Sequence, residues 1–465
     1  MIIIYNIFQV PVNWFKRLNL YLLYIYINLL LQKYINNITG LQLFQLLRFG
    51  TMLLISIVFA KSSLPTEAIG NYELFIFISM LVSSFWLNSL IQSLLPLYKN
   101  PDQPNTKNNK SPEIFNAYII ISLLSILTIL LLIIFQNPLS KVISHSGSIP
   151  YFNLILIYTF FSNPSFLIEY IYLLKNKPGS IIRYGVVSFS VHLVFVSLPV
   201  ILGMGLQTAL LGLLAVTFAR YCWLLFLLSK HAQLSISTGF IKKHLHYAWP
   251  LMISSLVGGS AIYVDGFLVV NKFDSATFAI FRYGAREFPL VMLMANALST
   301  AMIKDFSLKE NLQTSLHQLR KKSENLMHLL FPVTIVFLLS SQWLYPVIFN
   351  SNFRESADIF NIYLLLITTR LLFPHTILIG SKKMNIIMYA SFAELLTNVI
   401  LSIIFINIWG IEGIAFATVI AYTLQKVIWI VYNKKVLNIS PRKYIPLRTF
   451  AFYCFMTILI FTFML

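Results

Sequence analysis

Charged residues inside long apolar segments are the positions at which this chain could do chemistry. Only 11% of its residues are charged, whereas 58% are hydrophobic. A charge near the centre of a bilayer costs about 2.5–3.5 kcal/mol on insertion scales, so such residues face a helix-bundle interior, a water-filled cavity or the membrane edge. The basic residues in these segments include Arg48, Arg220, Arg282, Arg286, Arg370 and Lys426, and the acidic ones include Glu169, Asp265, Glu287 and Glu394.

The excess of arginine in these segments indicates an anionic ligand. A guanidinium group binds phosphate oxygens through a planar, bidentate fork, and a low dielectric strengthens the attraction. We therefore expect Arg48, Arg220, Arg286 and Arg370 to line a cationic substrate cavity. Arg370 is the strongest candidate because apolar residues flank it on both sides. Arg48 lies either at cavity depth or near the membrane edge, and Lys426 is expected to extend to that edge.

The acidic residues have two interpretations. Asp265 is expected to form an ion pair with Arg286 across neighbouring helices. Glu169 and Glu394 either bind a proton or cation or pair with a nearby basic residue. The sequence predicts no metal site or other cofactor, because its two cysteines lie in apolar runs without metal-ligand spacing and no nucleotide-binding or protease motif appears.

The elements that hold these charges are predicted to be membrane-spanning helices. A bilayer core about 30 Å thick needs about 20 apolar residues in helical form to cross it. The chain contains twelve such segments, which predicts an all-α polytopic membrane protein. They lie near residues 41–60, 71–97, 114–136, 151–174, 181–203, 206–229, 248–271, 276–303, 326–349, 356–380, 384–408 and 411–432.

The basic residues outside the spans fall almost wholly in every second connector. Lys242 and Lys243 are typical of the connectors that are rich in basic residues. This asymmetry places the rich connectors in the cytoplasm. A soluble nucleic-acid-binding protein is excluded, because its charge would form a patch on a polar surface. The net charge of +19 therefore reflects topology and attraction to anionic lipid headgroups. The poor connectors hold only Lys61, Lys141, Lys272 and Arg354.

The twelve segments divide into two halves. We expect an N-lobe at 41–229, a cytoplasmic linker at 230–247 and a C-lobe at 248–432. Residues 1–40 are predicted to be a cytoplasmic or interfacial segment. Residues 433–465 form a basic segment followed by an apolar tail, which either adds a thirteenth span or stays at the surface.

Short motifs support a duplication. After the first and the seventh span a short polar turn leads into a small residue, one spacer and an aromatic, and Gly70 and Tyr72 fall 209 positions before Ala279 and Phe281. Two parallel repeats would place a substrate site near the midplane, between the halves. The small residues of span 7 either let that helix bend or let it pack closely. They are Ser254, Ser255, Gly258, Gly259, Ser260 and Ala261.

Four stretches resemble the polysaccharide transporters of the multidrug/oligosaccharidyl-lipid/polysaccharide exporter superfamily, which includes O-antigen flippases. The turn at residues 60–72 is similar to the family's Leu-Gly-Pro-Glu-Glu-x-Gly-x-Tyr, and residues 281–286 are similar to its Tyr-x-x-Ala-x-Arg. Another stretch is Trp-Pro-Leu at residues 249–251, followed by Asp265 late in span 7. The last is residues 410–418, which are similar to the family's Gly-x-x-Gly-Ala-Ala-x-Ala-Thr. The sequence departs from the family at Ser63, where the family often has Gly, and at Ala279, which replaces a Gly.

The resemblance implies two six-helix lobes that rock about a central cavity in the bacterial cytoplasmic membrane. It also implies export of a polyprenyl-pyrophosphate-linked oligosaccharide, by alternating access and without catalysis. Coupling to membrane potential, Na⁺ or H⁺ is left open, with Asp265, Glu169 and Glu394 as candidate groups. Expected partners are the bilayer, the lipid-linked glycan and other polysaccharide-assembly proteins, and the oligomeric state is not predicted.

Two other functions compete with this one. A membrane polymerase or glycosyltransferase acting on lipid-linked sugars would need a large external loop or an acidic pair at the membrane surface. The longest external connector, residues 137–150, contains only Lys141, His145 and neutral residues. A multidrug efflux transporter would share the fold, but an arginine-rich interior disfavours cationic drugs.

Overall fold

The computed structural model describes residues 37–98, 110–143, 147–307, 312–381 and 383–464. Almost all of these residues are helical, and the described part contains no strand beyond one isolated bridge between Ser111 and Ala232. Within lipid, a continuous helix satisfies every backbone polar group internally. The prediction of an all-α polytopic membrane protein is confirmed. The interfacial helix expected within residues 1–40 lies mostly outside the described residues.

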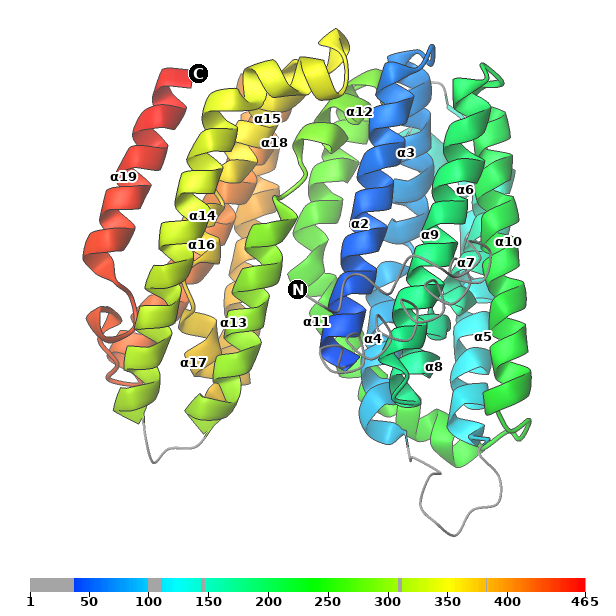
Figure 1. Ribbon diagram of the computed structural model, residues 1–465, viewed down its shortest axis with the longest axis horizontal. Helices are drawn as coiled ribbons and strands as arrows, with labels where there is room; N and C mark the ends of the chain where they lie inside the picture. Colours follow the sequence, from blue (N-terminus) through cyan, green and yellow to red (C-terminus); the bar gives the residue numbers. More distant parts are fainter. Residues whose placement is uncertain (1–36, 99–109, 144–146, 308–311, 382, 465) are drawn as a thin grey trace, which may run out of the picture.

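The first half of the chain forms a set of helices that we call the N-lobe (Figure 1). Proline occupies the first turn of α5 and of α9, where its missing N–H costs nothing. The members are α2 (Asn37–Lys61), α3 (Thr66–Leu81), α4 (Ser84–Leu97), α5 (Pro112–Ile134), α6 (Gln136–Ile143), α7 (Phe152–Ser165), α8 (Leu167–Leu174), α9 (Pro178–Ile201) and α10 (Gly205–His231).

The second half forms the C-lobe. Two of its helices begin with side-chain caps, because Ser237 accepts from the amide of Phe240 and Asp274 accepts from that of Thr277. The members are α11 (Thr238–Lys272), α12 (Ser275–Gly284), α13 (Pro289–Ser307), α14 (Leu312–Ile348), η2 (Ser351–Phe353), α15 (Glu355–Leu364), α16 (Ile367–Arg370), α17 (Pro374–Gly380), α18 (Met384–Lys435), η3 (Pro441–Lys443) and α19 (Leu447–Met464).

Four predicted spans are broken helices, which the apolar pattern alone does not reveal. The second span bends by 48° between α3 and α4, and the tenth bends by 47° before α17. The fourth breaks just after Pro164, and the eighth breaks before Pro289. Spans 2 and 8 occupy equivalent places in the two halves, as do spans 4 and 10. The breaks therefore fall in corresponding spans of the two predicted halves.

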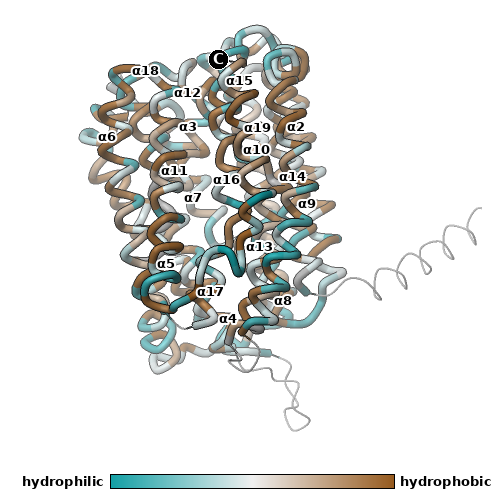
Figure 2. The backbone as a smooth tube through the Cα atoms, turned by 90° about the vertical axis from the view of Figure 1, so that its left-hand side faces the viewer, coloured by the Kyte–Doolittle hydropathy of each residue, from teal (hydrophilic) through white to brown (hydrophobic). Residues whose placement is uncertain are grey.

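The predicted spans all correspond to described helices. Among the described residues, eight helices are long and apolar enough to cross a membrane, and each of two bent pairs could add one. The longest, α18, holds spans 11 and 12, which are separated where Gly410 adopts a φ of 58°. The tail helix α19 also meets the criterion and lies beside α14 (Figure 1). Figure 2 shows hydrophobic residues along most of the helices' length, as a lipid environment requires.

The two lobes meet along two helix pairs. Helix α3 packs on α12, and α4 packs on α11. Gly70 of α3 allows the first contact, because a Cβ there would lie 1.7 Å from the carbonyl oxygen of Ser275. We call the end of the bundle where α4 finishes and α11 begins the basic end, since Lys242 and Lys243 lie there. It is the lower end in Figure 1, and the opposite end is the far end.

Candidate functional site

A buried carboxylate joins the two lobes near the far end. Glu73 of α3 is only 5% exposed. Its Oε1 lies 3.1 Å from an Nη atom of Arg286, and its Oε2 lies 3.5 Å from Nε of Arg282. The same Nη atom of Arg286 donates to Ser56 Oγ at 2.8 Å, which adds α2 to the contact. We call these four residues the far-end clamp, because they tie α2 and α3 of the N-lobe to the C-lobe.

Further hydrogen bonds join the two lobes to each other around the far-end clamp. Tyr283 donates its hydroxyl to the carbonyl oxygen of Ser56 at 3.2 Å. Asn350 donates to the carbonyl oxygen of Ala60 at 2.5 Å, and Asn352 donates to the hydroxyl of Thr66 at 3.1 Å. The structure therefore has its lobes in contact at the far end.

The expected ion pair between Arg286 and Asp265 is wrong. Helix α12 packs on α3, which directs Arg286 toward Glu73 across the lobe junction. Asp265 lies within the C-lobe instead. It is 1% exposed and accepts hydrogen bonds from Thr418 Oγ1 at 2.5 Å, Tyr363 Oη at 3.1 Å and Asn398 Nδ2 at 3.2 Å. A buried carboxylate is thus held by three neutral donors.

Arg370, the strongest cavity candidate from the sequence, is already paired. Its Nε and one Nη atom donate to the two carboxylate oxygens of Glu287 at 3.0 and 2.5 Å. The guanidinium carbon also lies 4.5 Å from the ring centroid of Tyr422. A cavity of about 10 Å³, room for about one water, adjoins the pair, and Tyr363 and Thr334 contribute to its lining. Because Tyr363 also contacts Asp265, the two C-lobe charge sites share a neighbour.

Lys426 does not reach the membrane edge. It is 6% exposed, and its Nζ donates to the carbonyl oxygen of Leu372 at 3.3 Å. That carbonyl is free because the tenth span breaks between α16 and α17. The expectation of a snorkelling lysine is therefore wrong, and the break in a neighbouring helix is the reason. Glu394 lies nearby and accepts a hydrogen bond from Gln425.

The N-lobe holds its own charged group. Arg220 of α10 donates Nε to Ser188 Oγ at 2.6 Å and approaches His192 Nδ1 at 3.4 Å, both on α9. Glu169 of α8 is 3% exposed, and Arg48 and Arg220 are the cations that act on it electrostatically. Within the described residues Arg48 makes no hydrogen bond or ion pair, and its guanidinium carbon lies 6.0 Å from the centroid of Phe166.

The four arginines predicted to share one cavity are thus divided among three places. Arg48 and Arg220 lie in the N-lobe, Arg286 lies at the lobe junction and Arg370 lies in the C-lobe. Arg286 and Arg370 each already contact a carboxylate, which occupies the place that an anionic ligand would take. Sequence reasoning overlooked Glu73, although an acidic residue inside a predicted span was a sufficient signal. The described residues contain no His, Cys, Asp and Glu cluster that could hold a metal ion.

Comparison with known proteins identifies the family to which the chain belongs. The family described as "Polysaccharide biosynthesis protein" matches residues 103–358, which is more than half of the chain. No curated protein matches the chain.

Solved structures resemble the whole arrangement of helices. The structure "Lipid II flippase MurJ, inward closed conformation" is 17% identical, with 90% of this chain and 91% of that chain covered and a TM-score of 0.65. An inward-facing multidrug resistance MATE family transporter of the MOP superfamily is 13% identical, with coverages of 87% and 98% and a TM-score of 0.60. A MOP superfamily transporter from Pyrococcus furiosus is also 13% identical, with coverages of 86% and 94% and a TM-score of 0.55. The chain therefore has the fold of MOP superfamily transporters.

Proposed function

Because this chain belongs to the polysaccharide biosynthesis protein family and has a transporter fold, we propose that it is a flippase. Its substrate would be a polyprenyl-pyrophosphate-linked oligosaccharide, such as the repeat unit of an O-antigen, capsule or exopolysaccharide. The protein would move the head group across the bacterial cytoplasmic membrane by alternating access. No bond is made or broken in this process, so the proposal assigns no catalytic residue.

The observation that carries the proposal is the set of guanidinium groups held inside membrane-spanning helices. Arg370 is the clearest case, because Glu287 meets it with two oxygens at 3.0 and 2.5 Å. A phosphate group, like a carboxylate, can present two negatively charged oxygens to one guanidinium group. A phosphate of the substrate could therefore take the place of the Glu287 carboxylate. Arg48 acts on Glu169 electrostatically but makes no ion pair or hydrogen bond among the described residues, so it would bind the substrate first.

The closed far end supports a direction of transport. The basic end corresponds to the cytoplasm under the positive-inside rule. With the far-end clamp formed, the head group would enter from the cytoplasmic side. Release would then require Glu73 to separate from Arg282 and Arg286, so that the lobes part at the far end.

Asp265 is the group that we propose for coupling to an ion. It is fully buried against Thr418, Asn398 and Tyr363, all of which are neutral. A buried carboxylate without a cationic partner is costly, and binding a proton or Na⁺ would remove that cost. Glu169 and Glu394 are alternative coupling groups, but basic residues already act on both of them.

Loss of an intramembrane arginine tests the proposal. Arg48→Ala and Arg370→Ala are each expected to reduce flipping of a lipid-linked oligosaccharide in proteoliposomes by about tenfold or more, since a hydrogen bond to a charged group contributes about 1.5–3 kcal/mol. Arg354→Ala is the matched control, because Arg354 is exposed in a far-end connector.

Wild-type flipping rates in both arginine variants would overturn the cationic-site mechanism. Transport of a cationic drug, with no flipping of the lipid-linked oligosaccharide by the wild type, would replace the proposal with multidrug efflux. Formation of new glycosidic bonds by the purified protein would replace it with an enzymatic function.

A further inference from the structure

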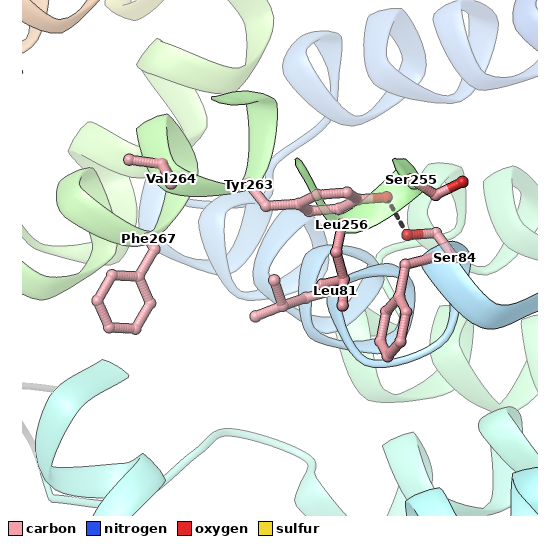
Figure 3. Close-up of a pocket in the computed structure, with 8 residues that line it drawn as sticks. Leu81, Ser84, Ser255, Leu256, Tyr263, Val264 and Phe267 are labelled. Carbon is pink, nitrogen blue, oxygen red and sulfur yellow. Dashed lines mark hydrogen bonds between the residues drawn. The ribbon is translucent and has the colours of Figure 1, made fainter. Parts of the chain in front are cut away.

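A cavity of about 220 Å³ lies between the two lobes (Figure 3). Its N-lobe wall is formed where α3 ends and α4 begins, at Leu81, Ser84 and Phe85. These positions are midway along the bent second span, so the cavity lies at about half the depth of the membrane. Its C-lobe wall is α11. The lining includes Leu256, Tyr263, Val264 and Phe267.

The lining is suited to hydrocarbon rather than to a polar head group. No charged residue contributes to it, and its hydroxyl groups bond to one another or to neighbours. Tyr263 donates to Ser84, as Figure 3 shows, and the Oγ atoms of Ser255 and Ser89 lie 3.2 Å apart. The volume is also below the roughly 300–1,000 Å³ typical of small-molecule sites. A segment of an apolar chain would suit both the uncharged lining and the small volume of the cavity.

An exposed apolar stripe connects the cavity with the basic end. Trp249, Ile253 and Leu256 lie on one face of α11, and they are 64%, 46% and 48% exposed. Leu256 belongs to both the stripe and the cavity lining. A chain that follows α11 from the basic end would therefore reach the cavity without crossing a charged surface.

We propose that this cavity, together with the stripe on α11, holds part of the polyprenyl chain of the substrate. This inference rests on the proposed function. A head group between the lobes needs its lipid chain to leave between the lobes, and this cavity is formed by both of them. An ordinary phospholipid would instead surround the outer faces of the lobes. Because α4 and α11 belong to different lobes, the chain would also contact both partners of the movement.

Photo-crosslinking of the full-length protein tests the site. The protein is placed in nanodiscs of phosphatidylethanolamine and phosphatidylglycerol with a polyprenyl phosphate that carries a diazirine in its chain. We expect labelling of peptides that contain residues 81–85 or 255–267, and unlabelled polyprenyl phosphate should displace the probe. The second arm uses phosphatidylethanolamine with a diazirine in an acyl chain, which should label these peptides weakly and without displacement.

A substitution that fills the cavity provides a variant to compare with the wild type in this experiment. Val264→Phe is expected to reduce labelling of these peptides about tenfold, which corresponds to about 1.4 kcal/mol of lost affinity. Val336→Phe is the control, because Val336 is 63% exposed on the surface of α14. The wild-type labelling pattern carries the test on its own if Val264→Phe does not fold.

Three results would overturn the inference. One is equal labelling by the phospholipid probe without displacement by polyprenyl phosphate, and another is the absence of labelling at the cavity. The third is a folded Val264→Phe variant that flips the lipid-linked oligosaccharide at the wild-type rate, in which case the proposed function stands and only the cavity assignment fails. Absence of flipping by the wild type itself would instead remove the proposed function and this inference with it.

Discussion

Individual buried charges in this protein are satisfied in three different ways. Glu73 contacts two guanidinium groups, and Glu287 binds one guanidinium group through both of its oxygens. Asp265, in contrast, accepts hydrogen bonds only from uncharged donors. An ion pair can be broken by a competing anion, whereas a carboxylate among neutral donors attracts a cation or a proton. The first two sites therefore suit movement and substrate binding, and the third suits ion coupling.

Glu73→Gln should weaken closure at the far end. The substitution removes the charge that Arg282 and Arg286 share, and charged hydrogen bonds contribute about 1.5–3 kcal/mol each. We expect the ratio of closed to open far end to fall about tenfold or more, as measured by electron–electron resonance distances between spin labels on the two lobes. Glu67→Gln, on the exposed face of the same helix, should leave the distances unchanged. Identical distance distributions in both variants would show that the far-end clamp does not hold the lobes together.

Asp265→Asn should remove ion dependence from transport. An asparagine keeps a similar shape but cannot bind a proton or Na⁺ through a charged carboxylate. We expect flipping in proteoliposomes to lose its response to an imposed Na⁺ or pH gradient, whereas Glu355→Gln should retain that response. A variant that still responds like the wild type would place coupling elsewhere, with Glu169 and Glu394 as the next positions to test.

The sequence was sufficient to find the intramembrane charges but not their partners. Arg286 and Glu73 are far apart in the chain, and their contact depends on the packing of α12 against α3. The pairing of Arg286 with Asp265 seemed natural because their helices are consecutive. Lys426 was assigned to the membrane edge from its place in the span, and only the break beside Leu372 explains its buried position.

At the scale of elements, the breaks within spans determine what the buried groups contact. Pro164 and Pro374 mark breaks in spans 4 and 10, and a proline inside an apolar segment is a signal that sequence can give. The bend between α3 and α4 has no proline or glycine at its centre, since Val82 and Ser83 stand there. Helix α11, which the small residues marked as a candidate for bending, is continuous over its 35 residues.

Gly70→Val should prevent α3 from packing on α12. A Cβ at this position would lie 1.7 Å from the carbonyl oxygen of Ser275, and backbone atoms cannot move aside locally. Overpacking typically costs about 1–3 kcal/mol, so we expect the lobes to separate at the far end and flipping to fall about tenfold. Gly50→Val on α2 is the control, because a Cβ there meets no neighbour. Normal flipping and normal interlobe distances in Gly70→Val would contradict the tight packing of these helices.

At the scale of the whole molecule, two similar lobes meet at mid-depth and at the far end. The fold class was accessible from the long apolar segments and the charge of the connectors, whereas the division into two halves stays a prediction. The angle between the lobes was not accessible from the sequence, because it depends on a few contacts such as those of Gly70 and Glu73. A transporter must change those contacts during its cycle, so a single sequence is compatible with more than one arrangement of the lobes.

Cysteine labelling should establish the orientation of the molecule. In a variant without Cys222 and Cys454, Met204→Cys is expected to react with a membrane-impermeant maleimide in intact cells. Lys230→Cys, at the opposite end of the same helix α10, should react only after the cells are permeabilised. The reverse pattern would invert the topology and the direction of transport that we propose.

Helix α19 has a practical consequence for anyone who handles this protein. It runs beside α14 toward the far end, so the end of α19 and the start of α2 lie at opposite ends of the helix bundle (Figure 1). If the far end faces the periplasm, as we propose, a green fluorescent reporter fused behind α19 would be carried to the compartment in which it often fails to mature, whereas alkaline phosphatase in that position would become active. An affinity tag placed there would be open to antibodies on unbroken spheroplasts.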